Sequence, residues 1–275
     1  MVVTSTKNGD GDSRYKADVV LLGASNVTRC IGTLVQSSRG MISGRLRFHI
    51  ACGHGRSFGQ YARVFGRGLP GILESGMWQA MDHSRASVET SPPMYALITD
   101  VGNDIMYGVA PEQISQWIRE CIERLQQHNA SVVLTALPMC TIESLQRWRY
   151  EVTKALLFPT RSMTFESAKD RARQVNQAIE DIGEQLDVPV VAQQAEWYGI
   201  DPIHIRFAQC RKAWHQILSH WPVEAGGHAL RAADVWRIWA RLHLTPPESR
   251  HLFGITQRRA QPAARLRDGS TIGLY

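Results

Sequence analysis

The chain lacks any run of about twenty apolar residues, so its sequence offers no candidate for a membrane-spanning helix. Residues 1–16 are polar and of mixed charge, without the apolar centre of a secretory signal. These two absences predict a disordered leader over residues 1–16, no membrane span and a cytoplasmic location.

Cysteine is scarce and scattered, because the 275 residues hold only Cys30, Cys52, Cys121, Cys140 and Cys210. An odd number without CxxC spacing indicates neither a disulfide framework nor a cysteine metal site, so we expect reduced, buried thiols. His215 and His220 are five residues apart, a poor spacing for two ligands on one helix face. The glycine-rich stretch 66–71 lacks the Gly-Lys-Ser/Thr of a phosphate loop. We therefore expect no metal and no cofactor.

Acidic residues are nearly absent from the last 26 positions, where Asp268 alone stands against Arg250, Arg258, Arg259, Arg265 and Arg267. These arginines contribute to a formal net charge of +6. We expect residues 246–275 to form an extended basic tail, which acts as a solvated arm or a subunit contact. Since no aromatic platform or nucleic-acid motif accompanies the tail, nucleic-acid binding by residues 246–275 ranks below these two roles. The sequence leaves the oligomeric state open.

Short apolar runs alternate with amphipathic stretches over most of the chain. The runs predict strands over 17–23, 45–51, 95–101, 131–137 and 188–192. The main predicted helices cover 27–40, 111–128, 166–186, 205–220 and 229–242, and shorter ones cover 58–65 and 71–81. Strands that alternate with helices are typical of a doubly wound parallel sheet with helices on both faces. We therefore predict one α/β domain over residues 17–245.

A serine follows the first predicted strand, and the rest of the candidate site is arranged around it. The run Ala17–Leu22 is continuous enough to be buried on both faces, and Gly23 permits a sharp exit from it. Ser25 then lies at the carboxyl end of the strand and at the start of a helix, where open α/β sheets place their chemistry. The alternative is that Ser25 only caps that helix.

Other polar residues and turn glycines follow the later strands. Gly53 comes after the second strand and Asn103 after the third, while Asp201 and His204 follow the fifth. Because the carboxyl ends of parallel strands meet at one edge of a sheet, residues almost 180 positions apart become plausible neighbours.

These residue types fit nucleophilic catalysis. The Ser25 hydroxyl needs a base to take its proton, His204 can be that base, and Asp201 can orient the imidazole. The oxyanion formed by attack on a carbonyl needs fixed donors. The backbone N–H groups of Ser25 and Gly53 and the side-chain amide of Asn103 can supply them.

Each of these residues also has a simpler interpretation. Gly53 can be an ordinary turn glycine, in which case Gly55 is the alternative donor. Asn103 can shape a turn or cap a helix, Asp201 can start a turn, and His204 can end a helix. The order of the residues and their common placement at strand ends favour one shared mechanism.

The same positions resemble the sequence blocks of the SGNH hydrolases, the GDSL-like esterase and lipase superfamily, over residues 18 to about 220. The matching segments are Gly23-Ala24-Ser25, Gly53, Gly102-Asn103-Asp104 and Asp201-Pro202-Ile203-His204. The resemblance implies a flavodoxin-like three-layer α/β/α sandwich with a central five-stranded parallel sheet. It also implies a cofactor-free hydrolase of small-molecule esters, with Ser25, His204 and Asp201 as catalytic residues and Ser25, Gly53 and Asn103 as the oxyanion hole.

One position departs from the family pattern, since Ala24 stands where the first block usually has aspartate. The aspartate supports the block rather than reacting, so the three catalytic candidates are unaffected. The departure keeps a second function open, a catalytically silent protein that binds a small molecule on a hydrolase scaffold. The sequence does not distinguish an ester, a thioester or an acetylated sugar as substrate.

Overall fold

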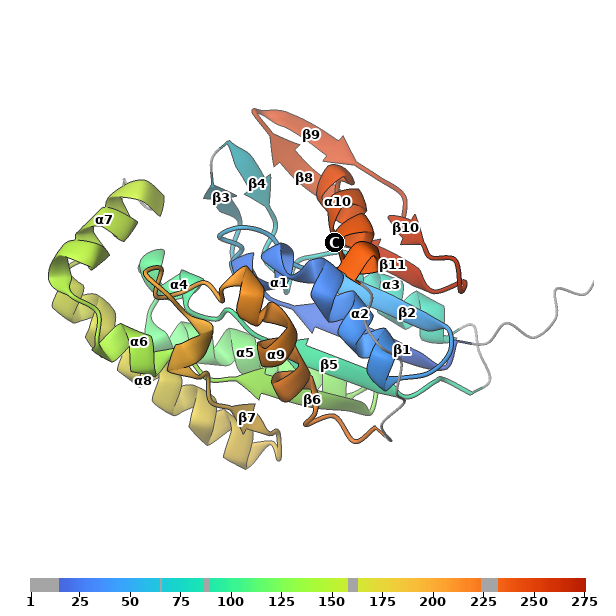
Figure 1. Ribbon diagram of the computed structural model, residues 1–275, viewed down its shortest axis with the longest axis horizontal. Coiled ribbons are helices and arrows are strands. Elements are labelled where there is room, and N and C mark those ends of the chain that lie inside the picture. Colours follow the sequence, from blue (N-terminus) through green and yellow to red (C-terminus); the bar gives the residue numbers. More distant parts are fainter. Residues whose placement is uncertain (1–14, 65, 87–89, 158–162, 224–231) are drawn as a thin grey trace, which may run out of the picture.

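The computed structural model describes residues 15–64, 66–86, 90–157, 163–223 and 232–275. The predicted leader over residues 1–16 therefore lies outside the described residues, apart from Tyr15 and Lys16. The centre of the molecule is a seven-stranded sheet in the order β10-β11-β2-β1-β5-β6-β7 (Figure 1). None of the helices in the described ranges is long and apolar enough to cross a membrane.

Five of the parallel strands of this sheet follow the predicted order along the chain. They are β1 (Ala17–Leu22), β2 (Leu46–Ala51), β5 (Met94–Ile98), β6 (Ala130–Thr135) and β7 (Val190–Val191). β1 lies between β2 and β5, with Leu22 opposite Ala51 and Ile98, and every residue of β1 is buried. The strand order β2-β1-β5-β6-β7 is that of flavodoxin-like sheets, which confirms the predicted doubly wound fold.

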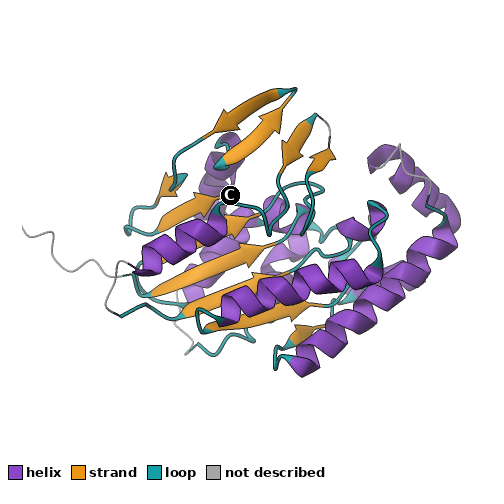
Figure 2. Ribbon diagram, turned by 180° about the vertical axis from the view of Figure 1, so that it is seen from behind, coloured by secondary structure: helices purple, strands orange, loops and turns teal. Residues whose placement is uncertain are grey.

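Helices cover both faces of the sheet, which gives the predicted three layers (Figures 1 and 2). One face carries α1 (Ser25–Arg29), α2 (Ile31–Met41), α9 (Phe207–Leu218) and α10 (Ala232–Leu244). The other carries α3 (Met77–Ala86), α5 (Pro111–Gln126) and α8 (Phe165–Gln185). Short helices α4 (Asn103–Met106), α6 (Met139–Glu143), α7 (Arg147–Leu157) and the 3-10 turn η1 (Ala195–Trp197) follow strands β5, β6 and β7. Short helices therefore follow the carboxyl ends of these strands, the edge of the sheet where the site was predicted.

The two clearest predicted helices are confirmed. α5 has Pro111 as its first residue and buries Ile114, Ile118 and Leu125 at helical spacing. α8 begins after Thr164, whose hydroxyl accepts a hydrogen bond of 3.3 Å from Ser167 N. Apolar periodicity therefore predicted the ends of both helices to within two residues.

The C-terminal segment is not the extended tail that its charge suggested. Residues 246–275 form β8 (Ser249–Leu252), β9 (Ile255–Arg258), β10 (Ala264–Arg265) and β11 (Thr271–Leu274). β11 is buried throughout and pairs in parallel with β2, so the sheet has seven strands rather than five. The buried Arg56 guanidinium also donates to the main-chain oxygen of Tyr275. The expectation failed because the arginines obscured a short apolar strand, Thr-Ile-Gly-Leu.

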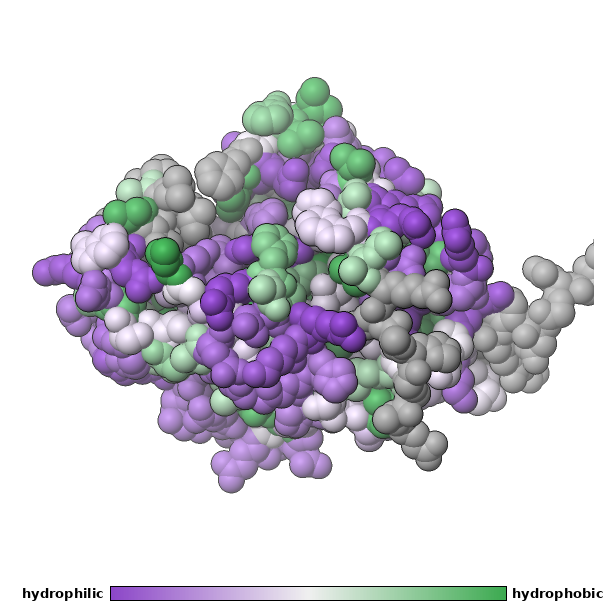
Figure 3. All heavy atoms as spheres, in the orientation of Figure 1, coloured by the Kyte–Doolittle hydropathy of each residue, from purple (hydrophilic) through white to green (hydrophobic). Residues whose placement is uncertain are grey.

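A second, antiparallel sheet replaces the short helix predicted over 58–65. β3 (Ala62–Val64) and β4 (Arg67–Leu69) pair with each other, and β4 pairs with β8 in the order β3-β4-β8-β9. The strands are only three or four residues long, so they show no periodicity that could be told from a helix. Figure 3 shows apolar side chains at the tip of the β8–β9 hairpin, where Phe253 and Ile255 are exposed.

The expectation that all five cysteines are reduced thiols is wrong for two of them. Cys30 and Cys210 form a disulfide between the start of α2 and α9, although 180 positions separate them in sequence. Cys52, Cys121 and Cys140 are free. The prediction of reduced thiols is therefore wrong for the first pair, because spacing along the chain says nothing of the proximity that the parallel sheet creates.

Candidate active site

Ser25 lies at the turn from β1 into α1. A Cβ atom at Gly23 would lie only 2.5 Å from Val27 Cγ2, so this turn is tight enough to need glycine. Ser25 is the first residue of α1, and the N-cap position before it is occupied by Ala24. The hydroxyl therefore does not cap the helix, and it is largely buried, with 9% of Ser25 exposed.

The loop before α9 brings a histidine and an aspartate to this hydroxyl. Ser25 Oγ lies 2.9 Å from His204 Nε2, and His204 Nδ1 lies 2.6 Å from Asp201 Oδ2. With its proton on Nδ1, the imidazole donates to Asp201 and accepts from Ser25. The structure thus brings together Ser25, His204 and Asp201, the three side chains that the sequence proposed as a catalytic group.

Asp201 organises its own loop as well as the imidazole. Its Oδ1 accepts hydrogen bonds from the backbone N–H groups of Ile203 (3.1 Å) and His204 (3.2 Å). Burial raises the pKa of the Asp201 carboxyl, but the hydrogen bond and charge of His204 and these N–H groups outweigh burial and lower it. Arg29 Nη1, 3.9 Å from Oδ2, adds a positive charge nearby. The carboxylate is therefore held ionised against the imidazole.

Asp100 is a residue of the site that the sequence reasoning missed. It follows β5 with a φ of 63°, a left-handed conformation that is uncommon for residues other than glycine. Its Oδ2 accepts from the N–H groups of Ala24 (2.9 Å), Asn26 (2.8 Å) and Val27 (3.2 Å). These hydrogen bonds hold the start of α1, which carries Ser25. The negative charge of the carboxylate also interacts favourably with the positive N-terminal end of the helix. The sequence feature that could have indicated this role is an aspartate just after β5, the strand that pairs with β1.

Asn26 is a second residue of the site that the sequence analysis did not single out. Its Nδ2 donates to Asp100 Oδ1 (2.8 Å) and to the carbonyl of Ile203 (2.9 Å), while its Oδ1 accepts from Ile205 N (2.8 Å). The side chain is 5% exposed, and both its donors and its acceptor are used. Asn26 therefore joins the turn that carries Ser25 to the loop that carries His204.

The proposed oxyanion donors are placed differently from one another. Asn103 is the first residue of α4 and lines the same pocket as Ser25. Asp100 accepts from three N–H groups around Ser25, and in the described part of the chain the Ser25 N–H itself has no acceptor. Gly53 lines a neighbouring cavity instead. Gly55, the alternative donor, has a φ of 66°, and its carbonyl accepts a hydrogen bond from the Tyr107 hydroxyl.

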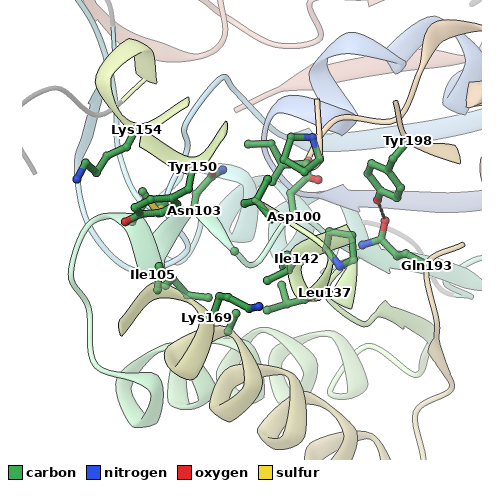
Figure 4. A pocket seen from close by; sticks show the side chains of 18 of the residues that line it. Asp100, Asn103, Ile105, Leu137, Ile142, Tyr150, Lys154, Lys169, Gln193 and Tyr198 are labelled. Carbon is green, nitrogen blue, oxygen red and sulfur yellow. Dashed lines mark hydrogen bonds between the residues drawn. The ribbon is translucent and has the colours of Figure 1, made fainter. Parts of the chain in front are cut away.

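An apolar pocket opens beside Ser25 (Figure 4). Its walls come from α4, α6, α7 and α8, and its apolar lining includes Ile105, Leu137, Ile142, Leu145 and Phe165. Lys154 and Lys169 also line it, but each is paired, with Glu151 at 2.7 Å and Glu143 at 3.2 Å. The space next to the hydroxyl therefore suits an uncharged, apolar group. Among the described residues, no three His, Cys, Asp or Glu side chains are grouped to hold a metal ion.

Comparisons with known proteins place esterases among the similar structures. No protein-family model and no curated protein matches the chain. The psychrotrophic esterase EstA from Pseudoalteromonas sp. is 11% identical, with a TM-score of 0.45 over 74% of this chain and 97% of that one. TesA is 12% identical, with a TM-score of 0.44 over 75% of this chain and 98% of that one. Est24, a carbohydrate acetylesterase from Sinorhizobium meliloti, is 13% identical, with a TM-score of 0.44 over 74% and 97%. Similarity at this level says nothing of the site, whose chemistry is inferred from its own geometry.

Proposed function

We propose that the protein is a serine hydrolase that cleaves carboxylic esters of small molecules. The observation that carries this proposal is the continuous chain from Ser25 Oγ to His204 Nε2 (2.9 Å) and from His204 Nδ1 to Asp201 Oδ2 (2.6 Å). A hydroxyl, a base and an orienting carboxylate in this arrangement are what activation of a serine requires.

In the proposed reaction, Ser25 Oγ attacks the ester carbonyl carbon while His204 takes the hydroxyl proton. The tetrahedral intermediate collapses when the bond to the leaving alcohol breaks, and His204 gives its proton to that alcohol. Water then attacks the acyl-enzyme and passes a proton to His204. The acid leaves as Ser25 Oγ recovers that proton, which restores the starting state.

The negative charge of the intermediate needs donors on the side of the carbonyl oxygen. The Ser25 N–H and the Asn103 amide are the first candidates, because both residues line the apolar pocket. The Gly53 N–H is the third. Loss of one well-placed donor costs about 3 kcal/mol of transition-state stabilisation. Substitution of Asn103 by Ala is therefore expected to lower kcat with little change in KM.

The acyl group of the substrate would occupy the apolar pocket. Ile105, Leu137 and Ile142 line it beside Ser25, and its two lysines are already paired with carboxylates. Such a lining favours a small or medium apolar acyl chain and disfavours a charged one.

A fluorophosphonate probe tests the nucleophile without a guess at the substrate. The probe should label Ser25, as mapped by mass spectrometry of the labelled peptide, and the label should disappear in Ser25→Ala and fall strongly in His204→Ala. Absence of label on folded wild-type protein, with a control serine hydrolase labelled in the same tube, would overturn the proposal. It would favour a catalytically silent protein that binds a small molecule in the same pocket.

A further inference from the structure

A second cavity lies close to the Ser25 turn and has a different lining. We call it the cationic cavity, and its polar lining includes Arg67, Arg250, His243, Thr28 and Tyr275. No aspartate or glutamate is among its described lining residues. The apolar pocket beside Ser25 has the opposite character, since its cations are neutralised by carboxylates.

The small antiparallel sheet directs the two arginines to one side. β4 and β8 pair with Arg67 opposite Leu252, so these two side chains lie on the same face. Leu69 is two residues after Arg67, and Arg250 is two residues before Leu252, which places all four on that face. Arg67, Leu69 and Arg250 accordingly line the cavity. Strand register therefore places both arginines on the face of the sheet that lines the cavity.

These positive charges are not neutralised within the described part of the chain. The Arg67 guanidinium has no hydrogen-bond acceptor or carboxylate partner there, and Arg250 Nε donates only to the neutral Gln257 Oε1, at 2.7 Å. Burial and the charge of Arg67 both lower the pKa of Arg250, as expected for two like charges close together. A bound anion would relieve this repulsion and pair with both groups.

The cavity adjoins the candidate active site through α1 and the loop after β2. Thr28, three residues after Ser25 in α1, lines the cavity, and its hydroxyl donates to the Ala24 carbonyl at 2.7 Å. Gly53, a candidate oxyanion donor, lines it as well. α1 contributes to both cavities, since Ser25 and Asn26 line the apolar pocket and Thr28 lines the cationic cavity.

We propose that the cationic cavity binds an anionic group on the leaving alcohol or thiol of the substrate, with phosphate or carboxylate as the anion. The acyl chain then lies in the apolar pocket, the scissile carbonyl at Ser25, and the anion against Arg67 and Arg250. This inference rests on the proposed hydrolase function for the identity of the ligand, but the cavity can be tested without it.

Direct binding is the first test. Phenyl phosphate and benzoate are titrated into the full chain by calorimetry, with Arg67→Gln and Arg250→Gln as test variants. Arg63→Gln removes the same charge from β3, where Arg63 is exposed and lies outside the cavity lining, and is the matched control. We expect each test variant to bind about tenfold more weakly and the control to bind like wild type. Equal affinities in all four proteins, or no saturable binding of either anion, would overturn the inference.

The kinetic test uses butyrate esters of phenol and of 4-hydroxyphenyl phosphate. The ratio of kcat/KM for the charged ester to that for the neutral ester should fall about tenfold in Arg67→Gln and stay constant in Arg63→Gln. An unchanged ratio in Arg67→Gln would contradict the leaving-group assignment. Failure to hydrolyse either ester would reject the hydrolase function instead, and the calorimetric result would still decide whether the cavity binds anions.

Discussion

At the scale of single residues, substitution of Asn26 tests how far the reaction depends on the positions of Ser25 and His204. It bonds to Asp100, Ile203 and Ile205 but not to Ser25 or His204. In Asn26→Ala the loop of His204 loses the two hydrogen bonds that the Asn26 side chain makes to Ile203 and Ile205. Since small misplacements of catalytic groups cost about a hundredfold in rate, kcat for ester hydrolysis should fall by about that factor with KM little changed. Steady-state kinetics on a neutral butyrate ester measures both constants.

The matched control for this variant is Gln177→Ala. Gln177 is exposed on α8, and its amide donates to Asp181 on the surface at 2.9 Å, so its loss removes a carboxamide far from the loop of His204. The control should keep the wild-type kcat. A folded Asn26→Ala protein with wild-type kcat would show that the contact between the two loops is dispensable for the reaction.

The sequence allowed prediction of the proposed catalytic side chains but not of the side chains that hold them. Ser25, Asp201 and His204 could be placed because strand ends in a parallel sheet share one edge. Asp100 could not, because its role depends on a left-handed backbone and on three N–H groups of another strand's turn. Asn26 likewise acquires its role only when residues 203–205 are brought against it.

At the scale of elements, the sequence analysis erred most over residues 246–275, which were expected to be an extended tail. The contribution of β11 to the stability of the sheet can be tested by substitution. Ile272 in β11 is fully buried against β2, whereas Ile255 in β9 is 68% exposed. Ile272→Ala should lower the free energy of unfolding by about 2–4 kcal/mol, because it removes apolar burial and leaves a cavity. Ile255→Ala removes the same atoms at the surface and should change it by about 0.5 kcal/mol or less. Urea unfolding of both variants makes the comparison, and equal effects would mean that β11 is not part of the sheet.

Length and periodicity decided which elements the sequence could predict. α5 and α8 have 16 and 21 residues, enough for an apolar stripe to repeat several times. β3, β4 and β10 have two or three residues each, and their strand character comes from partners far along the chain. For such short segments local propensity decides little, and the pairing of β4 with β8 outweighs it.

At the scale of the whole molecule, the topology explains both what was predicted and what was missed. Alternation of strands and helices fixed the parallel core, and with it the meeting of Ser25 and His204. Two contacts between distant segments were not predicted from the sequence. They are the pairing of β11 with β2 and the disulfide between Cys30 and Cys210. These contacts depend on the folded arrangement of elements that are not neighbours in sequence.

Global stability should depend on pH through Asp104, which is fully buried in α4. Its Oδ2 accepts from Phe58 N at 3.0 Å, and its Oδ1 has no partner among the described residues. Burial raises the pKa of this carboxyl to about 6, although the Phe58 N–H opposes the shift. Between about pH 4 and pH 6 the folded protein therefore holds a proton that the unfolded chain has released. Stability from this group is present at low pH and is lost as the pH rises through 6.

Asp104→Asn isolates that contribution, because asparagine keeps an acceptor for Phe58 N but does not titrate. All other groups titrate alike in the two proteins, so the difference between their free energies of unfolding reports Asp104 alone. From about pH 4.5 to pH 7.5, wild type should lose about 2 kcal/mol relative to the variant. Urea denaturation at a series of pH values measures the difference. A difference that stays constant over this range would mean that Asp104 ionises normally, and hence that water reaches the carboxyl beneath the loop of Phe58.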